Sequence, residues 1–314
     1  MTVESYDVVV IGGGPAGLSA ALNLVRARRR VLVVDGNRPR NAATLTAHGF
    51  LTRDGISPLE LRRLARDEVE SYDEGEVVFA QVTGLTVSGS GFRVVASGVR
   101  GAADIDVLAD TVVIATGLTE TLPAVPSIRA YYGTQLHSCV ECDAYEKSDA
   151  PLALIGETHD LAERALLLTQ WTSDLIVFTN GVGTVGDDDE RTLARLGVSV
   201  ERRPIDDVVG ERGAMTGIRL TDGTEIARSG GFVRPLWSPS LSFVDDLDLD
   251  RDDDGFLVTD AAGRTSLPGV YAAGESTEPG PQQLIVAAGS GAVVAAAVNR
   301  DLIGVSVERD APVL

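Results

Sequence analysis

The chain has 314 residues, of which 44% are hydrophobic, so it is long enough for two ordinary domains and its composition excludes a disordered protein. The formal net charge of −19 is spread along the chain rather than gathered in a tail. Because phosphate backbones and anionic lipids bind to clustered Lys and Arg, nucleic acid and membrane are poor partners. The longest apolar stretches are of strand length or are interrupted by glycine and charge. The N-terminus (MTVESYDVVV) lacks a basic region ahead of an apolar segment, so we expect a cytoplasmic protein.

The chain opens with a strand, a helix and a second strand. Residues 6–11 (YDVVVI) form an uninterrupted apolar run, which is typical of a strand buried on both faces. Three glycines then turn the chain, and a helix is expected over residues 15–28, because a proline fits the first helical turn. Residues 31–35 (VLVVD) are the second strand, and a further helix is expected to begin near Pro58.

The turn after the first strand carries a dinucleotide-binding fingerprint. It reads Gly12-Gly-Gly14-Pro15-Ala16-Gly17, and Asp35 ends the following strand. Glycines let backbone N–H groups approach a pyrophosphate, the helix N-terminus favours its charge, and the acidic residue binds ribose hydroxyls. Because strand, helix and acidic residue all stand in their expected places, the sequence predicts a nucleotide site here.

Two later segments favour FAD over NAD as the nucleotide. Residues 111–117 (TVVIATG) resemble the strand and turn that flavoprotein reductases carry before their second domain. Residues 265–275 (TSLPGVYAAGE) resemble the late motif whose carboxylate meets the ribityl chain of FAD. That family usually has Asp where this chain has Glu275, so the resemblance implies a slightly remodelled contact.

The only two cysteines, Cys139 and Cys142, stand three residues apart. In the reducing cytoplasm a structural disulfide is rare, so the pair indicates redox chemistry. Two sulfurs at this spacing at the start of a helix can close a small ring, and the helix N-terminus stabilises a thiolate, whereas the intervening Glu141 opposes it and is either a tuning or a solvent-facing residue. A zinc site needs four ligands and only His137 lies close by, so no metal is expected.

With these motifs, the chain resembles the low-molecular-weight thioredoxin reductases over essentially its full length. The resemblance implies an α/β fold of two Rossmann-like three-layer ββα domains. Residues 1–117 and 241–314 would form a discontinuous FAD domain, and residues 118–240 an inserted, degenerate nicotinamide-type domain that carries the CxxC motif. It further implies a homodimer in which Cys142 lies nearest the flavin, Cys139 exchanges with the substrate and Asp143 handles protons.

The same resemblance assigns the FAD-binding residues. They are Gly12, Gly14, Pro15, Ala16, Gly17, Asp35, Gly36, Arg40, Asn41, His48, Thr116, Gly117, Gly274, Glu275, Gln282, Gln283 and Leu284. Residues 35–58 depart from ordinary thioredoxin reductases and are more similar to a branch that includes the dithiol oxidases of gliotoxin and holomycin biosynthesis. His48 falls about where thioredoxin reductases carry an Asn beside the flavin, either as a proton relay or as a packing residue.

A second strand, helix and strand are expected at residues 152–156, near 160–170 and at 175–178, followed at the end by a small-residue helix over about 281–300. The family's NADPH site needs GxGxxA after the first of these strands, but here the second glycine is Thr158 and the small residue is Leu161. The stretch after the next strand lacks the arginines that hold a 2′-phosphate, so NADPH is unlikely to be the cofactor. The run Gly181–Gly186 matches GxGxxG by letter only, and we interpret it as a loop before a helix capped by three aspartates.

The sequence favours three functions in descending order. The first is an FAD-dependent dithiol oxidase that passes electrons to oxygen. The second is a reductase of thioredoxin or a similar small protein, fed by a donor such as ferredoxin, and the third is a redox-sensing flavoprotein. The substrate would be a small-molecule or small-protein dithiol or disulfide, and Trp237 either lines its pocket or belongs to the core.

Overall fold

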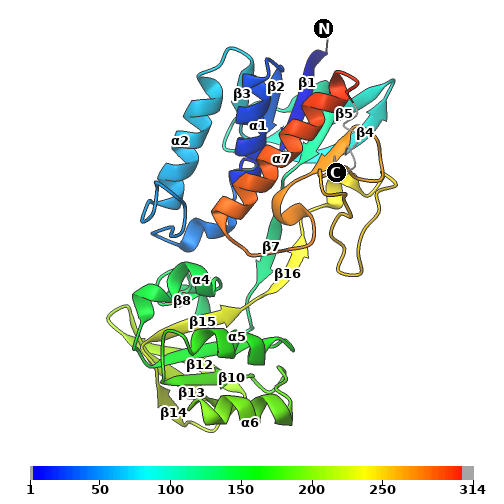
Figure 1. Cartoon of the computed structure of the whole chain (residues 1–314). Helices are drawn as coiled ribbons and strands as arrows, with labels where there is room; N and C mark the ends of the chain where they lie inside the picture. The colour runs from blue at the N-terminus through cyan, green and yellow to red at the C-terminus, as the bar shows by residue number, and fades with distance from the viewer. Residues whose placement is uncertain (1–2, 306–314) are drawn as a thin grey trace, which may run out of the picture. The chain divides into compact units, whose positions relative to one another are not determined.

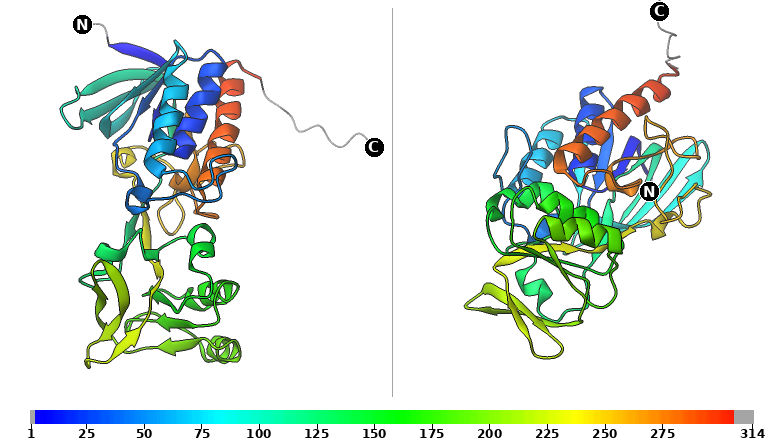
Figure 2. Two further views of the ribbon diagram at one scale, coloured as in Figure 1. Left: turned by 90° about the vertical axis from the view of Figure 1, so that its left-hand side faces the viewer. Right: turned by 60° about the horizontal axis from the view of Figure 1, so that its bottom comes forward.

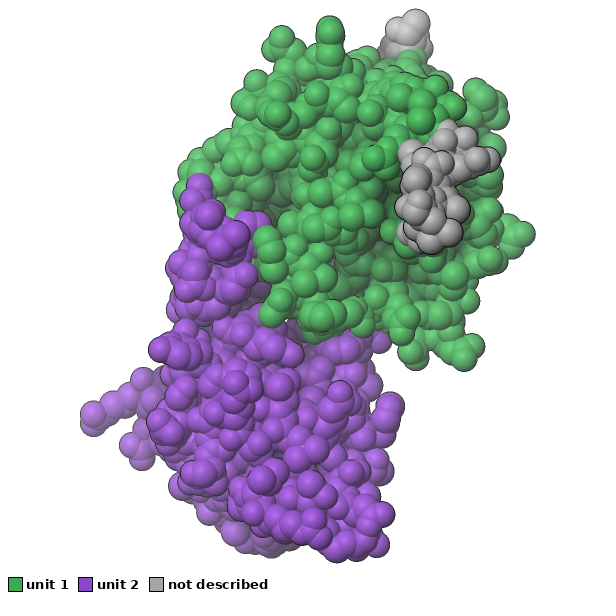
Figure 3. Space-filling model, viewed as in Figure 1, with its two compact units in different colours: residues 1–39, 59–119, 238–314 green, residues 40–58, 120–237 purple. Residues whose placement is uncertain are grey.

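The computed structural model describes residues 3–305, which form two compact units (Figures 1 and 3). Unit 1 consists of residues 1–39, 59–119 and 238–314. Unit 2 consists of residues 40–58 and 120–237. The chain passes between the units after residues 39, 58, 119 and 237. The last two crossings lie in β7 (Leu118–Thr121) and β16 (Leu236–Pro239), which pair as a two-stranded sheet.

Unit 1 is built on one sheet with the strand order β3-β2-β1-β6-β5-β4. Its strands are β1 (Glu4–Ile11), β2 (Val31–Val34), β3 (Gly75–Val78), β4 (Ala80–Ser88), β5 (Gly91–Gly98), β6 (Ile105–Ile114) and β17 (Val270–Ala272). The first four strands of this order pair in parallel, whereas β4 and β5 are antiparallel. The long strand β6 pairs with β5 through residues 105–109 and with β17 through residues 112–114.

The parallel strands of unit 1 are buried on both faces, as the apolar runs predicted. Successive side chains of a strand point to opposite faces. Val8 and Val10 pack with the helices α1 (Pro15–Arg26) and α7 (Leu284–Leu302). Val9 and Ile11 pack instead with the antiparallel strands β4 and β5. A third helix, α2 (Pro58–Glu70), follows residues 40–58, and the unit is the expected three-layer ββα arrangement.

Helix α7 packs along α1, and the two lie side by side in Figure 2. An added Cβ at Gly291 would lie 2.0 Å from the Ala16 carbonyl oxygen, so the backbones touch at this point. Among the described residues α7 alone is long and apolar enough to cross a membrane, with a mean hydropathy of 1.3. Its buried face, which includes Val294, Ala295 and Val298, belongs to the core of unit 1, and this packing accounts for its small and apolar residues.

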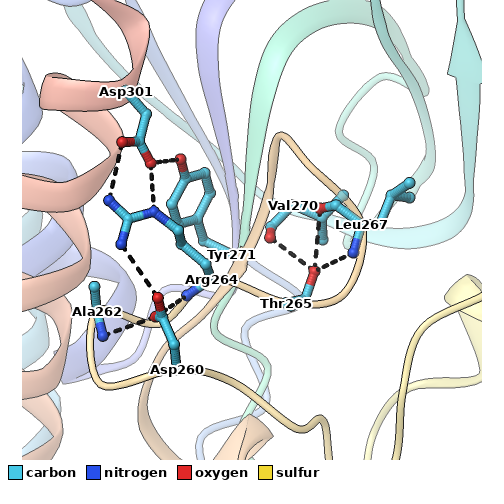
Figure 4. Close-up of polar contacts among 8 residues, drawn as sticks. All are labelled: Asp260, Ala262, Arg264, Thr265, Leu267, Val270, Tyr271 and Asp301. Carbon is cyan, nitrogen blue, oxygen red and sulfur yellow. Dashed lines mark hydrogen bonds and ion pairs between the residues drawn. The ribbon is translucent and has the colours of Figure 1, made fainter. Parts of the chain in front are cut away.

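A polar network ties the end of α7 to the segment before β17 (Figure 4). Asp301 accepts hydrogen bonds from Arg264 Nε at 2.6 Å and from the Tyr271 hydroxyl at 2.5 Å. Arg264 also contacts Asp260, whose Oδ1 accepts the Arg264 and Ala262 N–H groups. Burial and the Asp301 carboxylate raise the pKa of Tyr271, so the hydroxyl stays a donor.

Unit 2 contains a five-stranded parallel sheet with the order β11-β10-β9-β15-β8. The strands are β8 (Leu136–His137), β9 (Leu152–Gly156), β10 (Leu175–Phe178), β11 (Ser199–Glu201) and β15 (Gly230–Arg234). A three-stranded antiparallel sheet is formed by β12 (Ile205–Glu211), β13 (Ala214–Leu220) and β14 (Glu225–Ala227). The helices are α3 (Ile128–Tyr131), α4 (Val140–Asp143), α5 (Leu161–Leu168) and α6 (Asp187–Arg195).

Strand β9 shows why unit 2 also has three layers. Leu152 and Leu154 pack against α5 and α6 on one face of the parallel sheet. Ala153 and Ile155 pack against the antiparallel strands on the other face. The predicted fold class, an α/β chain with two Rossmann-like ββα parts, is therefore confirmed.

The structure shifts several predicted boundaries. The first helix ends at Arg26 rather than at residue 28, and the last begins at Leu284 rather than at residue 281. The run Gly181–Gly186, which matches GxGxxG by letter only, is a loop before α6. The first turn of that helix contains three aspartates. Residues 40–58, which the predicted division places with the FAD domain, pack with unit 2.

Two glycines of α7 provide a stability test. Gly291→Ala is expected to lower the free energy of unfolding by about 1–3 kcal/mol, because its methyl group forces α7 away from α1. Gly289→Ala on the same helix has open space and is expected to raise that free energy by about 0.5–1 kcal/mol. Urea unfolding followed by circular dichroism measures both, and changes of equal size and sign would contradict the close packing.

Candidate active site

The two cysteines form a disulfide with an S–S distance of 2.03 Å and a Cα–Cα distance of 5.3 Å. Cys139 is the N-cap residue of α4, a helix of one turn, and Cys142 lies within that turn. The buried residues Val140 and Ala144 anchor the turn in the core of unit 2. Because α4 is so short, the macrodipole expected to stabilise a thiolate is small. The side chain of Glu141 points to solvent, since that residue is exposed.

Asp143, the predicted proton handler, ends the same turn and contacts His137. The distance between Asp143 Oδ1 and His137 Nδ1 is 3.0 Å, and both side chains are nearly buried. His137 Nε2 lies 2.9 Å from the Thr134 carbonyl oxygen. The structure therefore gives His137 a position beside the redox pair that the sequence considered only for zinc. Among the described residues, no group of three or more His, Cys, Asp or Glu side chains could hold a metal ion.

A second buried polar network lies close to the cysteines. The Tyr132 hydroxyl donates to Glu120 at 2.5 Å, and Arg40 donates to the other oxygen of that carboxylate at 3.1 Å. Burial and the Glu120 charge raise the pKa of Tyr132, which also interacts with the side chain of Ser138. This network links the segment that begins at Arg40 to the residue before Cys139.

Residues 40–58 fold over part of unit 2. Ala43 O lies where a side chain on Gly133 would project, 2.2 Å from its ideal Cβ. His48 Nδ1 lies 3.5 Å from Asp54, and its Nε2 lies 3.5 Å from Glu146. Glu146 follows the turn Cys139–Asp143, which we call the redox turn. Arg40, Asn41 and His48 therefore lie on unit 2, and their part in binding FAD stays a prediction.

In unit 1 the fingerprint glycines form the expected turn between β1 and α1. Gly12 has φ +115°, and an added Cβ there would lie 2.3 Å from the Ala115 carbonyl oxygen. Gly17 passes so close to Gly12 that a Cβ would lie 1.9 Å from its carbonyl oxygen. Gly14 caps α1 without a side-chain hydrogen bond, and no atom lies within 4 Å of its ideal Cβ. The space beside Gly14 at the start of α1 is thus open, which suits a pyrophosphate.

Asp35 directly follows β2, and its carboxylate has a partner that the sequence did not indicate. Its Oδ2 accepts a hydrogen bond from Arg62 Nη2 at 2.7 Å, and its Oδ1 accepts one from the Asn37 N–H at 2.7 Å. Each oxygen keeps a further lone pair for a ribose hydroxyl. A Cβ on Gly13 would lie 2.4 Å from Oδ2, so only glycine fits beside this pair.

The two later FAD segments converge on the same edge of the sheet. Fully buried Ser276 accepts a hydrogen bond from the Gly117 N–H at 3.1 Å, and its hydroxyl lies 3.3 Å from that of Thr116. Gly274 has φ +64° and donates its N–H to Ser290 on α7. Gln283 is the N-cap residue of α7, directly before Leu284. Unit 1 therefore gathers the ends of β1, β6 and β17 around the N-terminus of α1.

The corresponding turn in unit 2, between β9 and α5, is filled. The fully buried Leu161 side chain lies 2.5 Å from the ideal Cβ of Gly156. Asp160 accepts hydrogen bonds from the Thr158 hydroxyl at 2.6 Å and from Arg234 Nε at 2.6 Å. Arg164 Nε lies 3.2 Å from the same carboxylate. The chain thus places a carboxylate of its own in this turn.

The Asp160 carboxylate contacts two arginines in this cluster. Burial by itself raises the pKa of Asp160, but the hydrogen bonds from Thr158 and Arg234 and the two arginine charges outweigh it and lower that pKa to about 2. Both guanidinium groups lie near the Trp237 ring, Arg234 at 3.6 Å and Arg164 at 5.4 Å from its centroid. Trp237 is half-buried in this cluster. Arg164 and Arg234 escaped the sequence analysis, although Arg234 ends a strand at the carboxyl edge of the sheet.

Two glycine variants separate folding from nucleotide binding. Gly14→Ala is expected to lower the affinity for FAD at least about tenfold, because its methyl group enters the open space before α1, with a change in stability below about 1 kcal/mol. Gly12→Ala is expected to impair folding as well, since its Cβ meets backbone. Flavin absorbance after dialysis and urea unfolding of the flavin-free proteins measure the two effects. Full flavin content in Gly14→Ala would contradict the assigned site.

The Asp160 cluster predicts a pH-dependent stability. Asp160 ionises at a lower pH in the folded chain than its unfolded value near 4, so the carboxylate stabilises the fold above about pH 4 and this contribution is lost as the pH falls toward 2. Asp160→Asn is expected to lower the free energy of unfolding by about 1–2 kcal/mol at pH 7 and by little at pH 2. The exposed Asp188→Asn is the control and should change it by less than about 0.5 kcal/mol. Equal effects in both variants would contradict the cluster.

Comparison with known proteins agrees with this geometry. Residues 6–291 match the pyridine nucleotide-disulphide oxidoreductase family. The structure resembles that of a thioredoxin reductase-like protein, TrxB, from Bacillus anthracis, with 36% identity, a TM-score of 0.88 and coverage of 95% of this chain and 98% of that one. It also resembles HlmI, with 38% identity, a TM-score of 0.87 and coverage of 95% and 93%.

Among curated proteins, the thioredoxin reductase of Escherichia coli O157:H7 is 26% identical over 97% of this chain and 98% of its own length. Membership of this family implies FAD binding, and the open N-terminus of α1 beside Gly14 fits the pyrophosphate of that cofactor. The disulfide at Cys139 and Cys142 fits an enzyme that acts on sulfur groups. The chain therefore belongs to the pyridine nucleotide-disulphide oxidoreductase family, as a thioredoxin reductase-like flavoprotein.

Proposed function

We propose that this protein is an FAD-dependent dithiol oxidase, which forms a disulfide in a dithiol substrate and passes the electrons to oxygen. The observation that carries the proposal is the filled turn of unit 2. Leu161 and Asp160 fill the turn at which the family's second nucleotide would bind, and the Asp160 carboxylate already contacts Arg164 and Arg234. NADPH has no cradle there, so the electrons are expected to come from the substrate rather than from a nicotinamide.

The residues of the redox turn have distinct roles in this proposal. A substrate thiolate attacks Cys139, the Cys139–Cys142 bond breaks, and the Cys142 sulfur leaves with the electron pair. The second substrate thiolate then attacks the mixed disulfide, which releases the oxidised substrate and a Cys139 thiolate. Asp143 exchanges protons with the sulfurs. FAD, when bound in unit 1, supplies the two-electron acceptor that reoxidises the dithiol.

Residues 40–58, which belong to unit 2, support a function in the dithiol-oxidase branch of the family. Residues 35–58 resemble those of dithiol oxidases in gliotoxin and holomycin biosynthesis. Within this stretch Ala43 lies against Gly133 and His48 lies 3.5 Å from Glu146, and these two contacts flank the cysteines in the sequence. The likeness to HlmI, at 38% identity, agrees with that resemblance. We infer a small-molecule or peptide dithiol as the substrate class.

The other parts of the proposal concern assignment and assembly. Unit 1 binds FAD through the predicted residues that it contains, whereas Arg40, Asn41 and His48 belong to unit 2. Unit 2 is a nicotinamide-type domain that has lost its nucleotide, and the chain acts in the cytoplasm as a homodimer. The family resemblance supports these assignments, and the open and filled turns support the two that concern nucleotides.

A second candidate is a reductase of thioredoxin or of a similar small protein. It is favoured by the similarity to the thioredoxin reductase of Escherichia coli. Because the turn of unit 2 is filled, this reductase would take its electrons from a donor other than NADPH, such as ferredoxin. The two candidates differ in the direction of electron flow through Cys139 and Cys142.

Anaerobic reduction of the flavin distinguishes the electron donors. Dithiothreitol is expected to bleach the FAD absorbance of the purified protein, whereas micromolar NADPH leaves it oxidised. Aerobically, dithiothreitol should drive oxygen uptake with formation of hydrogen peroxide. Cys142→Ser is expected to reduce both dithiol reactions at least about a hundredfold while it keeps its flavin. His159→Gln, an exposed substitution outside the redox turn, is the control and should react like the parent protein.

Two other outcomes would change the proposed function. Rapid bleaching by NADPH would overturn the proposal, because it requires a working nicotinamide site. Turnover with reduced ferredoxin and oxidised thioredoxin, without oxygen uptake from dithiols, would establish the second candidate instead.

A further inference from the structure

Helix α2 carries two consecutive arginines with opposite surroundings. Arg63 is half-exposed and contacts Glu60 and Asp67 of its own helix. Arg62 is buried, and its Nη2 donates a hydrogen bond to Asp35 Oδ2 at 2.7 Å. An arginine is almost never fully buried unless it is paired, so Asp35 is the partner that makes this position possible.

The carboxylate of Asp35 is held by both of its oxygens. While Oδ2 accepts from Arg62, Oδ1 accepts a hydrogen bond from the Asn37 N–H at 2.7 Å. Asn37 has φ +52°, a left-handed conformation that asparagine adopts more readily than most residues. Its side-chain oxygen accepts a second, longer hydrogen bond from Arg62 Nη2 at 3.4 Å. The three residues form a closed ring of hydrogen bonds, which fixes the orientation of the Asp35 side chain.

Arg62 also contacts the glycine turn of the fingerprint. Its Nε donates to the Gly13 carbonyl oxygen at 3.4 Å. Because a guanidinium group is planar, its donors act at a fixed spacing, and one side chain can hold two acceptors in a defined relation to each other. Arg62 therefore connects the two parts of the predicted nucleotide site, which are the turn for the pyrophosphate and the carboxylate for the ribose.

The pair of Arg62 and Asp35 is nearly closed to water. Their side chains are only 6% and 7% exposed, so solvent screens the attraction between them far less than it screens a surface pair. Removal of one partner from such a pair leaves the other charge buried and unpaired. Without Arg62, the Asp35 carboxylate loses the contact that sets its orientation, and rotation toward water becomes favourable.

We propose that Arg62 is a positioning residue for FAD, which fixes the Asp35 carboxylate where the adenosine ribose binds and so makes unit 1 selective for a ribose with its 2′-hydroxyl. The inference rests on the proposed binding of FAD by unit 1. Each Asp35 oxygen accepts one hydrogen bond from the protein and keeps a further lone pair for a ribose hydroxyl. An acceptor that is already oriented loses less freedom when the ligand binds, which strengthens binding.

The test compares FAD with an analogue whose adenosine ribose lacks the 2′-hydroxyl. Equilibrium dialysis of the full-length protein, with flavin absorbance as the readout, gives the dissociation constant of each. The parent protein is expected to bind FAD at least about tenfold more tightly than the analogue, because a hydrogen bond to a carboxylate is charge-assisted. Arg62→Met is expected to bind FAD at least about tenfold more weakly and to reduce this preference below about threefold. Equal weakening of both flavins, with an unchanged preference, would indicate a merely structural role and overturn the proposal.

Three further variants make the comparison specific. Arg62→Lys keeps the charge but not the planar group, so its preference should lie between those of the parent protein and Arg62→Met. Arg63→Met, on the same helix, is the matched control and should keep the parent values. The double variant Asp35→Ala/Arg62→Met leaves neither charge buried alone, which keeps the test available if Arg62→Met folds poorly. It should bind FAD no more weakly than Asp35→Ala, because the two residues act as a unit, and additive losses would overturn the pairing.

The outcomes separate this inference from the assignment on which it rests. If Asp35→Ala keeps the parent preference, Asp35 does not meet the ribose, and both the assignment and the inference are overturned. If Asp35→Ala loses the preference and Arg62→Met keeps it, only the inference is overturned. These binding constants do not depend on the electron donor, so the dithiol oxidase and the role of Arg62 fail separately.

Discussion

The chemistry of this protein depends on how firmly one turn of chain is held in the core of unit 2. Leu136 and Ala144 are buried on either side of the cysteines and Val140 is buried between them, so this turn has little freedom. Cys139 and Cys142 remain half-exposed, whereas the side chains of His137 and Asp143 are nearly buried. A fixed backbone thus holds two partly accessible sulfurs next to a nearly buried carboxylate and imidazole.

Both units contain the same strand-turn-helix pattern, but the turn is open in unit 1 and filled in unit 2. In unit 1 the turn before α1 is lined by glycines and leaves open space beside Gly14. In unit 2 the turn before α5 is closed by Leu161 and by the carboxylate of Asp160. Both sheets bury their strands on two faces, so the same fold accommodates either kind of turn. A few side chains leave one turn open and fill the other.

Much of this was accessible from the sequence because it depends on local patterns. Apolar runs identify the buried strands, and the fingerprint at Gly12–Gly17 works through backbone geometry that only glycine permits. The partners of charged groups could not be predicted in this way. Arg62 reaches Asp35 over 27 residues and Arg234 reaches Asp160 over 74, and such pairs are set by the packing of whole elements. The placement of residues 40–58 on unit 2 escaped prediction for the same reason.

The ion cluster at Asp160 also constrains how this chain could change. A substitution that removed Asp160 alone would strand two guanidinium groups against the Trp237 ring, and one that removed Leu161 alone would leave a void beneath Gly156. Opening this turn therefore requires several coordinated replacements, each unfavourable by itself. A protein engineer who wants open space before α5 must replace Leu161, Asp160 and the two arginines together.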